Sequence, residues 1–323
     1  DVLWEAMVSG RSAVRRIERF DASGFACPFA AELPADAFNV RQVVPRSYRK
    51  NTKVMCRDVE LAVGAAAASV ADAGLVTKGT DADTAPTIDP ARFGCQIGAG
   101  LISADVDELA EALMTSRGAD GDFDLGLWGA GAMENLTPLW LLKYLPNMLA
   151  CHVTIVHDCQ GPSNTITCCE ASSALSLGES VRVIDRDAAD ACLTGGAEFK
   201  LNPMAYVRQQ FARRLATVDG HVDPTTIARP FAAEATGTVL GEGGGILVVE
   251  AESHATARGA KPYARVTGFA TTQSFCPDTV GLEVPEDDAS LGDAVRGALD
   301  DAGIRPDAID AIGPFGSSLP GVD

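Results

Sequence analysis

The sequence predicts an α/β fold with a mainly parallel sheet, because short apolar strand candidates alternate with amphipathic helices. Residues 93–98 form a short apolar run of the kind that fills a buried strand. Residues 163–167 and 189–194 give two further strand candidates, and residues 171–184 between them have helical apolar spacing. Parallel strands need a crossover of this kind, so the succession indicates a sheet covered by helices.

Two helices are expected ahead of this core. Helical apolar spacing begins with Asp1 and stops near Gly10. Residues 57–74 predict a long amphipathic helix that Gly74 ends. Its buried side is expected to carry small and β-branched residues, namely Val59, Val63, Ala66, Val70 and Ala73.

The middle of the chain predicts a loop followed by more helices and strands. Residues 79–90 are rich in Asp, Thr and Pro, which predicts a surface loop, and residues 105–114 predict a helix. Two helices separated at Pro146 are expected in residues 135–156. Residues 238–250 predict two strands interrupted by glycines.

The last part of the chain predicts four more elements. A short helix should end at Gly259, and residues 263–272 should form a strand. Residues 290–302 have helical spacing, and residues 309–316 predict a final strand and turn.

Size and charge limit the classes of function. A chain of 323 residues has room for about two domain-sized units. Its net charge of −18 opposes binding to nucleic acid or to an anionic membrane surface. We expect no membrane span, because no apolar run reaches roughly 18 residues, and we expect no signal peptide at the start of this sequence. Two basic clusters are either solvated or docking surfaces for an acidic partner: Arg208, Arg213 and Arg214, and Arg46, Arg49, Lys50 and Lys53.

The nine cysteines are odd in number and irregularly spaced, which predicts reduced thiols and a cytoplasmic protein. Cys151 and His152 are adjacent, and His157 is followed by Asp158 and Cys159. Because these spacings match no common zinc pattern, no metal site is expected.

Two other features are given no chemical role. Residues 241–245 are rich in glycine, but no Lys-Ser/Thr pair follows, so they do not predict a phosphate loop and no cofactor is expected. His221 and His254 lie in segments expected at the surface, where both imidazoles would be solvated.

One segment resembles a known family. Residues 161–173 read Gly-Pro-Ser-Asn-Thr-Ile-Thr-Cys-Cys-Glu-Ala-Ser-Ser, and residues 195–198 read Gly-Gly-Ala-Glu. Both are similar to the nucleophile region of the β-ketoacyl synthases, which extend acyl chains on acyl carrier protein. The family's cysteine lies nine residues after the first glycine and twenty-five before the second motif. Both counts reach Glu170.

The likeness continues in family order through residues 145–155, 229–243, 257–264 and 298–304. It implies the thiolase-like fold, an α/β architecture layered α-β-α-β-α from two pseudo-symmetric halves. Residues 1–232 would be the N-terminal ketosynthase half without its first strand, and residues 233–323 the incomplete start of the C-terminal half. We therefore expect a fragment truncated at both ends, because half a sheet would leave strand edges and apolar faces exposed.

The resemblance also implies a catalytic set of one cysteine and two histidines. The thiolate accepts the acyl group, and the histidines assist decarboxylation and stabilise the oxyanion. Residues 309–320 resemble the His-Gly-Thr turn of the first histidine, with Phe315 in its place. Glu170 cannot form an acyl thioester and Phe315 cannot carry a proton, so two parts of the machinery are changed.

Three functions remain open. The first is a non-condensing subunit of the chain-length-factor type in fatty-acid or polyketide-type biosynthesis, paired with an intact ketosynthase through strands near residues 163–167. The second is an active 3-oxoacyl synthase or malonyl decarboxylase that uses Glu170 or Cys169, and a homodimer is the alternative to the heterodimer. Cys169 is expected instead to be a buried small residue that points into the core. The third is a separate acyl-binding module.

Overall fold

The computed structural model describes residues 2–34, 36–219, 221–274 and 288–323. The chain divides into two compact units, each made of more than one segment. Unit 1 comprises Asp1–Pro34, Lys200–Glu242 and Ala264–Asp323, and unit 2 comprises Ala35–Phe199 and Gly243–Tyr263. The expected division after residue 232 remains a prediction.

Unit 2 is built on a four-stranded sheet. Its strands are β3 Phe93–Gly98, β4 Ser163–Ile166, β5 Ala191–Phe199 and β6 Glu242–Glu250, in the order β4-β3-β5-β6. β3 is parallel to both β4 and β5. β6 runs antiparallel to β5, since the Ala251 N–H donates to the Asp190 carbonyl at one end and Gly195 lies against Gly245 further along. The sheet is therefore mixed rather than wholly parallel.

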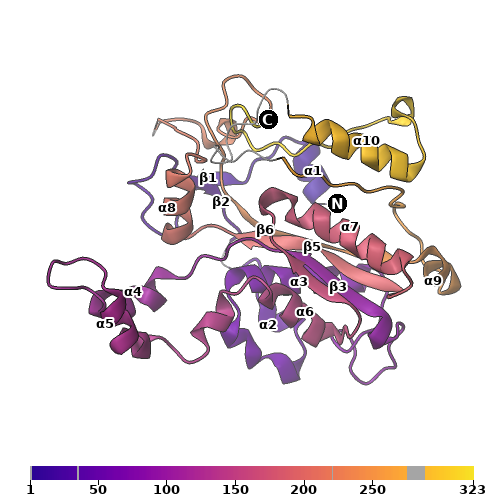
Figure 1. The fold of residues 1–323 in the computed structure, drawn as a ribbon, viewed down its shortest axis with the longest axis horizontal. Coiled ribbons are helices and arrows are strands. Elements are labelled where there is room, and N and C mark those ends of the chain that lie inside the picture. The colour runs from indigo at the N-terminus through magenta and orange to yellow at the C-terminus, as the bar shows by residue number, and fades with distance from the viewer. Residues whose placement is uncertain (1, 35, 220, 275–287) are drawn as a thin grey trace. The chain divides into compact units, whose positions relative to one another are not determined.

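Three helices cover the two faces of this sheet. Figure 1 shows α7 Ser172–Asp185 on one face and both α3 Arg57–Asp72 and α6 Met148–His157 on the other. All six residues of β3 are buried, as expected of a strand covered on both sides. The predicted inner side of α3 is confirmed, because four of its expected residues are fully buried: Val59, Val63, Ala66 and Val70.

The remaining helices of unit 2 are short. They are α2 Val40–Val43, α4 Val106–Thr115, α5 Leu125–Ala130 and α9 Glu252–Ala257. The expected first helix of residues 135–156 is wrong: only a 3₁₀ turn, Trp140–Lys143, forms there, preceded by Leu139 in a left-handed conformation. No helix in the described part of the chain is long and apolar enough to cross a bilayer.

The described residues of unit 1 form a short antiparallel pair of strands and three helices. Strands β1 Val14–Arg16 and β2 Phe29–Ala31 pair with each other. The helices are α1 Val2–Val8, α8 Pro203–Phe211 and α10 Ser290–Ala302. The expected helices of residues 2–8 and 290–302 are confirmed, whereas Asp1 lies outside the described residues.

Three strand predictions are wrong. Residues 238–250 form one strand, β6, and Thr238 and Gly241 make only isolated bridges. Residues 263–272 and 309–316 are irregular in the described structure. An apolar run becomes a strand only when a neighbouring strand pairs with it, and here the Phe269 N–H donates to the Asp301 side chain instead, at 2.9 Å.

Candidate functional site

The expected nucleophile position lies in a sharp turn between strand β4 and helix α7. The chain leaves β4, passes through Cys168, and forms a 3₁₀ turn at Cys169–Ala171 before α7 begins. Cys169 has φ +48°, a left-handed conformation that is uncommon for a residue other than glycine. We call residues 167–171 the elbow, and all five are exposed.

Ser172 holds the elbow in this shape. The Cys168 N–H donates to Ser172 Oγ at 2.8 Å, and that hydroxyl donates to the Cys169 carbonyl at 2.6 Å. The Ala171 N–H closes the turn on the Cys168 carbonyl at 3.1 Å. Because Ser172 is buried, these bonds are shielded from water and fix the backbone of the elbow.

Glycines allow α7 to lie close to the sheet. A Cβ on Gly98, at the end of β3, would lie 2.5 Å from the carbonyl carbon of Ser172. Gly195 in β5 has φ +142°, and a Cβ there would lie 2.0 Å from the Gly245 carbonyl oxygen. A larger residue at Gly98 would push α7 away from β3, so this glycine lets the start of α7 lie over the end of the strand, whereas Gly195 lets β5 lie close to β6.

A hydroxyl pair fastens α7 to β5 below the elbow. Ser176 Oγ is fully buried and lies 2.8 Å from the Ser173 carbonyl oxygen and 3.1 Å from that of Gly195. Thr194 Oγ1 donates to Ser176 Oγ at 3.1 Å, and the Gly195 N–H donates to Ser176 Oγ at 3.3 Å. These bonds satisfy polar groups that would otherwise be buried without partners.

The side chains of the elbow differ from what the sequence led us to expect. Cys169 is exposed rather than buried, as is Cys168. The residues that enter the interface between α7 and the sheet are Ser172 and Ser176, one and two turns further on. Glu170 is exposed beside the two thiols, and its carboxylate can bind a proton or a cation but cannot serve as a thiol nucleophile.

The turn that carries Phe315 lies in unit 1, whereas Glu170 lies in unit 2. Phe315 is 64% exposed. The Asp323 carboxylate accepts from Ser317 Oγ at 2.5 Å and from the backbone N–H groups of Ser317 and Ser318 at 2.7 Å each. These hydrogen bonds, led by the Ser317 hydroxyl, hold the pKa of Asp323 below its usual value. The turn is thus a fixed backbone scaffold that presents an apolar ring.

The cysteine and histidine pairs near α6 serve packing. His152 Nδ1 lies 2.7 Å from the Tyr48 hydroxyl, and His157 Nδ1 lies 2.9 Å from Thr77 Oγ1. Burial lowers the pKa of both imidazoles, that of His157 to about 4, so both are neutral at pH 7. Within the described residues, no three His, Cys, Asp or Glu side chains gather as a metal ion would require.

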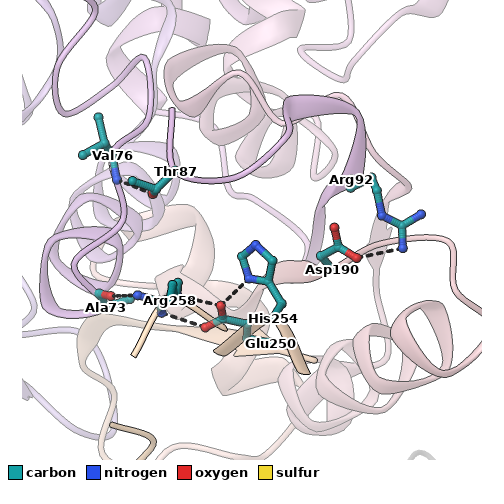
Figure 2. Close-up of polar contacts among 8 residues, drawn as sticks. All are labelled: Ala73, Val76, Thr87, Arg92, Asp190, Glu250, His254 and Arg258. Atoms are coloured by element: carbon teal, nitrogen blue, oxygen red, sulfur yellow. Dashed lines mark hydrogen bonds and ion pairs between the residues drawn. The ribbon is translucent and has the colours of Figure 1, made fainter. Parts of the chain in front are cut away.

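A polar cluster occupies the end of the sheet opposite the elbow. Figure 2 shows Glu250, at the end of β6, between His254 and Arg258. Glu250 Oε1 lies 2.5 Å from His254 Nδ1, and Arg258 donates to both carboxylate oxygens at 2.6 and 2.7 Å. The Arg258 side chain also reaches the Ala73 carbonyl at 2.8 Å, just after α3. His254 was expected to be solvated, and that expectation is wrong because Glu250 holds its ring.

Two loops brace the same end of unit 2. Arg92, just before β3, pairs with Asp190, just before β5, at 2.8 Å. The Val76 N–H donates to Thr87 Oγ1 at 2.9 Å and fixes the surface loop that follows α3. This end of the sheet is therefore stabilised by charge pairs, whereas the elbow end carries the exposed thiols and carboxylate.

Comparison with known proteins agrees with the fold. Residues 1–255 match the family described as beta-ketoacyl synthase, N-terminal domain. The chain is 31% identical over 319 residues to 3-oxoacyl-[acyl-carrier-protein] synthase 2 of Staphylococcus aureus strain N315, which covers 98% of this chain and 69% of the relative. It therefore belongs to the β-ketoacyl synthase family, whose members make fatty acids and polyketides.

Two solved structures are similar over nearly the whole chain. A β-ketoacyl synthase from Burkholderia phymatum STM815 superposes with a TM-score of 0.78 at 26% identity, covering 98% of this chain and 70% of that one. The ishigamide ketosynthase/chain length factor gives a TM-score of 0.69 at 25% identity, covering 95% of this chain and 66% of that one. The family includes synthases and chain length factors, so membership alone does not assign a catalytic role to this chain.

Proposed function

We propose that this chain is a non-condensing, ketosynthase-like subunit that acts beside an intact ketosynthase in fatty-acid or polyketide-type biosynthesis. The observation that carries the proposal is Glu170, which stands where both sequence counts place the family's cysteine. A condensing enzyme holds its acyl group as a thioester during the reaction. A carboxylate at that position leaves the chain without the nucleophile that this step needs.

The turn at Phe315 supports the same proposal. The turn is braced by Asp323 and by Ser318 Oγ, which accepts from the Arg229 N–H at 2.9 Å. An aromatic hydrocarbon ring on this scaffold neither donates to an oxyanion nor transfers a proton. Two changes of this kind on preserved scaffolds are what we expect of a subunit kept for its shape rather than for its chemistry.

Features of the surface suit a partner subunit. β4 is the edge strand of the described sheet, with Ser163 and Asn164 exposed. Such an edge can pair with a strand of a second subunit. The solved ketosynthase/chain length factor structure gives a precedent for a ketosynthase that pairs with a related subunit. We infer a heterodimer of this kind, with a homodimer as the alternative.

Acyl carrier protein is the proposed second partner. The basic cluster of residues 46–53 lies on two 3₁₀ turns, Arg46–Tyr48 and Asn51–Val54, and on the two residues between them. All four of its cationic residues are exposed on a chain whose net charge is −18: Arg46, Arg49, Lys50 and Lys53. A local positive patch steers an acidic partner even when the whole protein is acidic.

Co-expression with the nearest-encoded cysteine-containing ketosynthase tests the proposal. We expect the two chains to co-purify and to make a condensed product from acyl and malonyl carrier substrates. Replacing the partner's cysteine by alanine should abolish the product, whereas Glu170→Ala in this chain should leave most of it. Product that persists without the partner's cysteine would contradict the proposal.

The exposure of Cys169 favours a second candidate function, an enzyme that uses this thiol in place of residue 170. A left-handed residue in a turn ahead of a helix presents its side chain outward, as a nucleophile requires. If so, Cys169→Ala should abolish acyl transfer by this chain alone, while the matched Cys168→Ala variant should retain it. Equal behaviour of the two variants would reject this candidate.

A further inference from the structure

The elbow carries two consecutive free thiols on the surface. Cys168 and Cys169 are the exposed cysteines among the eight that the structure describes. Cys151 is partly exposed, and the other five are buried: Cys27, Cys56, Cys95, Cys159 and Cys192. A reagent in solution therefore meets the adjacent pair before it meets the thiols of the core.

The core thiols are also less reactive. Burial raises the pKa of Cys56 to about 12 and that of Cys192 to about 11. It raises the pKa of Cys95 and Cys159 as well. Because the thiolate is the reactive form, these groups stay protonated and unreactive at neutral pH. Thiol chemistry on the described surface is therefore directed to the elbow.

The two elbow cysteines are close enough to react as a pair. Their Cα atoms are joined by a trans peptide, which fixes them about 3.8 Å apart. Disulfides usually join Cα atoms at about 4.4–6.8 Å, so a bond between neighbours closes a small, strained ring. Strained disulfides are reduced easily, which makes such a bond reversible rather than a permanent cross-link.

We propose that Cys168 and Cys169 form a vicinal dithiol site that is oxidised by low-molecular-weight disulfides. One elbow thiolate attacks a sulfur of the small disulfide, and that bond breaks to release one small thiol. The second elbow thiol then loses its proton and attacks the mixed disulfide, which releases the other small thiol. Two elbow thiols are oxidised to one disulfide, and the small disulfide is reduced to two thiols.

A disulfide between Cys168 and Cys169 would constrain the same backbone that Ser172 holds by hydrogen bonds. The Cys168 N–H and the Cys169 carbonyl are the two groups bonded to Ser172 Oγ. A covalent link between the residues that carry these groups would constrain the start of α7. This inference rests on the exposure and adjacency of two thiols and not on the role proposed for Glu170.

Oxidised glutathione and peptide mass mapping test the site on the full chain. After incubation and alkylation without reduction, we expect the peptide with Cys168 and Cys169 to be unalkylated and lighter than the dithiol by two hydrogens. Dithiothreitol should restore alkylation at both. The variants Cys168→Ser and Cys169→Ser should each trap glutathione on the remaining cysteine, and the control Cys151→Ser should behave as the unchanged protein.

Three results would overturn the proposal. One is a stable glutathione adduct on either elbow cysteine of the unchanged chain. Another is full alkylation of both, and the third is oxidation directed to core cysteines instead. The unchanged chain decides the matter, so a variant that fails to fold does not obscure the result.

Discussion

His157 should make this protein lose stability as the pH falls below neutrality. Its imidazole is 3% exposed, and burial lowers its pKa from 6.5 to about 4. The folded protein therefore holds a neutral ring, whereas the unfolded chain binds a proton below about pH 6.5. His157 is cationic when protonated, and folding lowers its pKa. Its contribution to stability is therefore full above pH 6.5 and is lost as the pH falls towards 4.

The size of the effect follows from the two pKa values. A difference of about 2.5 pKa units corresponds to about 3 kcal/mol, of which about 2 kcal/mol is lost between pH 7.5 and pH 5. The substitution His157→Asn removes the titrating ring while keeping a polar group that can face Thr77. We expect this variant to be less stable at pH 7.5 but to lose about 2 kcal/mol less than the unchanged protein on going to pH 5.

Urea unfolding followed by circular dichroism at the two pH values measures this difference. The matched control is His221→Asn, because the side chain of His221 is exposed. That control should keep the pH dependence of the unchanged protein. If His157→Asn shows the same loss of unfolding free energy as the unchanged protein, the assignment of a neutral buried imidazole is wrong.

Three further predictions concern the elbow, the opposite end of the sheet and the basic cluster. Gly98→Ala should lower the free energy of unfolding by about 1–3 kcal/mol or more, because the added methyl group meets the α7 backbone. The control Gly243→Ala has no atom within 4 Å of the added carbon and should cost less than about 1 kcal/mol, so equal losses in urea unfolding would refute this packing. Arg258→Ala should lower the melting temperature by a few degrees, because it leaves the half-buried Glu250 with His254 alone. Adding Glu250→Gln to Arg258→Ala should make the loss of melting temperature smaller than the sum of the two single losses, and additive losses would argue against a shared cluster. The double charge reversal Arg49→Glu with Lys50→Glu should weaken the binding of acyl carrier protein at least tenfold in titration calorimetry. The control reversal of Arg208 and Arg213 should leave that binding unchanged, and a larger loss in the control would place the docking surface near α8 instead.

The core of unit 2 could be predicted from sequence because its signals are local and strong. The glycine stop of α3, the apolar run of β3 and the helical spacing of α7 each lie within one element. Strands β1 and β2 have three residues each, too few for an alternating pattern to show. Helix α8 was missed although Asn202, a capping residue, and Pro203 mark its start.

The assignment of the site to Glu170 remains a prediction, and the local geometry of the elbow could not be predicted. Two motif counts agree on Glu170, yet they contain no information on how the elbow turns. The exposure of Cys169 depends on a left-handed backbone that Ser172 fixes, and no residue pattern signals it. The hydrogen bonds between Ser176 and Thr194 and between Ser317 and Asp323 join residues that become neighbours only after folding. Such hydrogen bonds leave no periodic trace in a sequence.

Mass spectrometry of the chain after incubation with an acyl-loaded carrier protein tests the central claim most directly. If Glu170 stands in place of the condensing nucleophile, the peptide that spans the elbow should carry no acyl group. The Glu170→Cys variant restores a thiol at the family's position, so its elbow peptide should become acylated. An acyl thioester found on Cys169 of the unchanged chain would contradict the account.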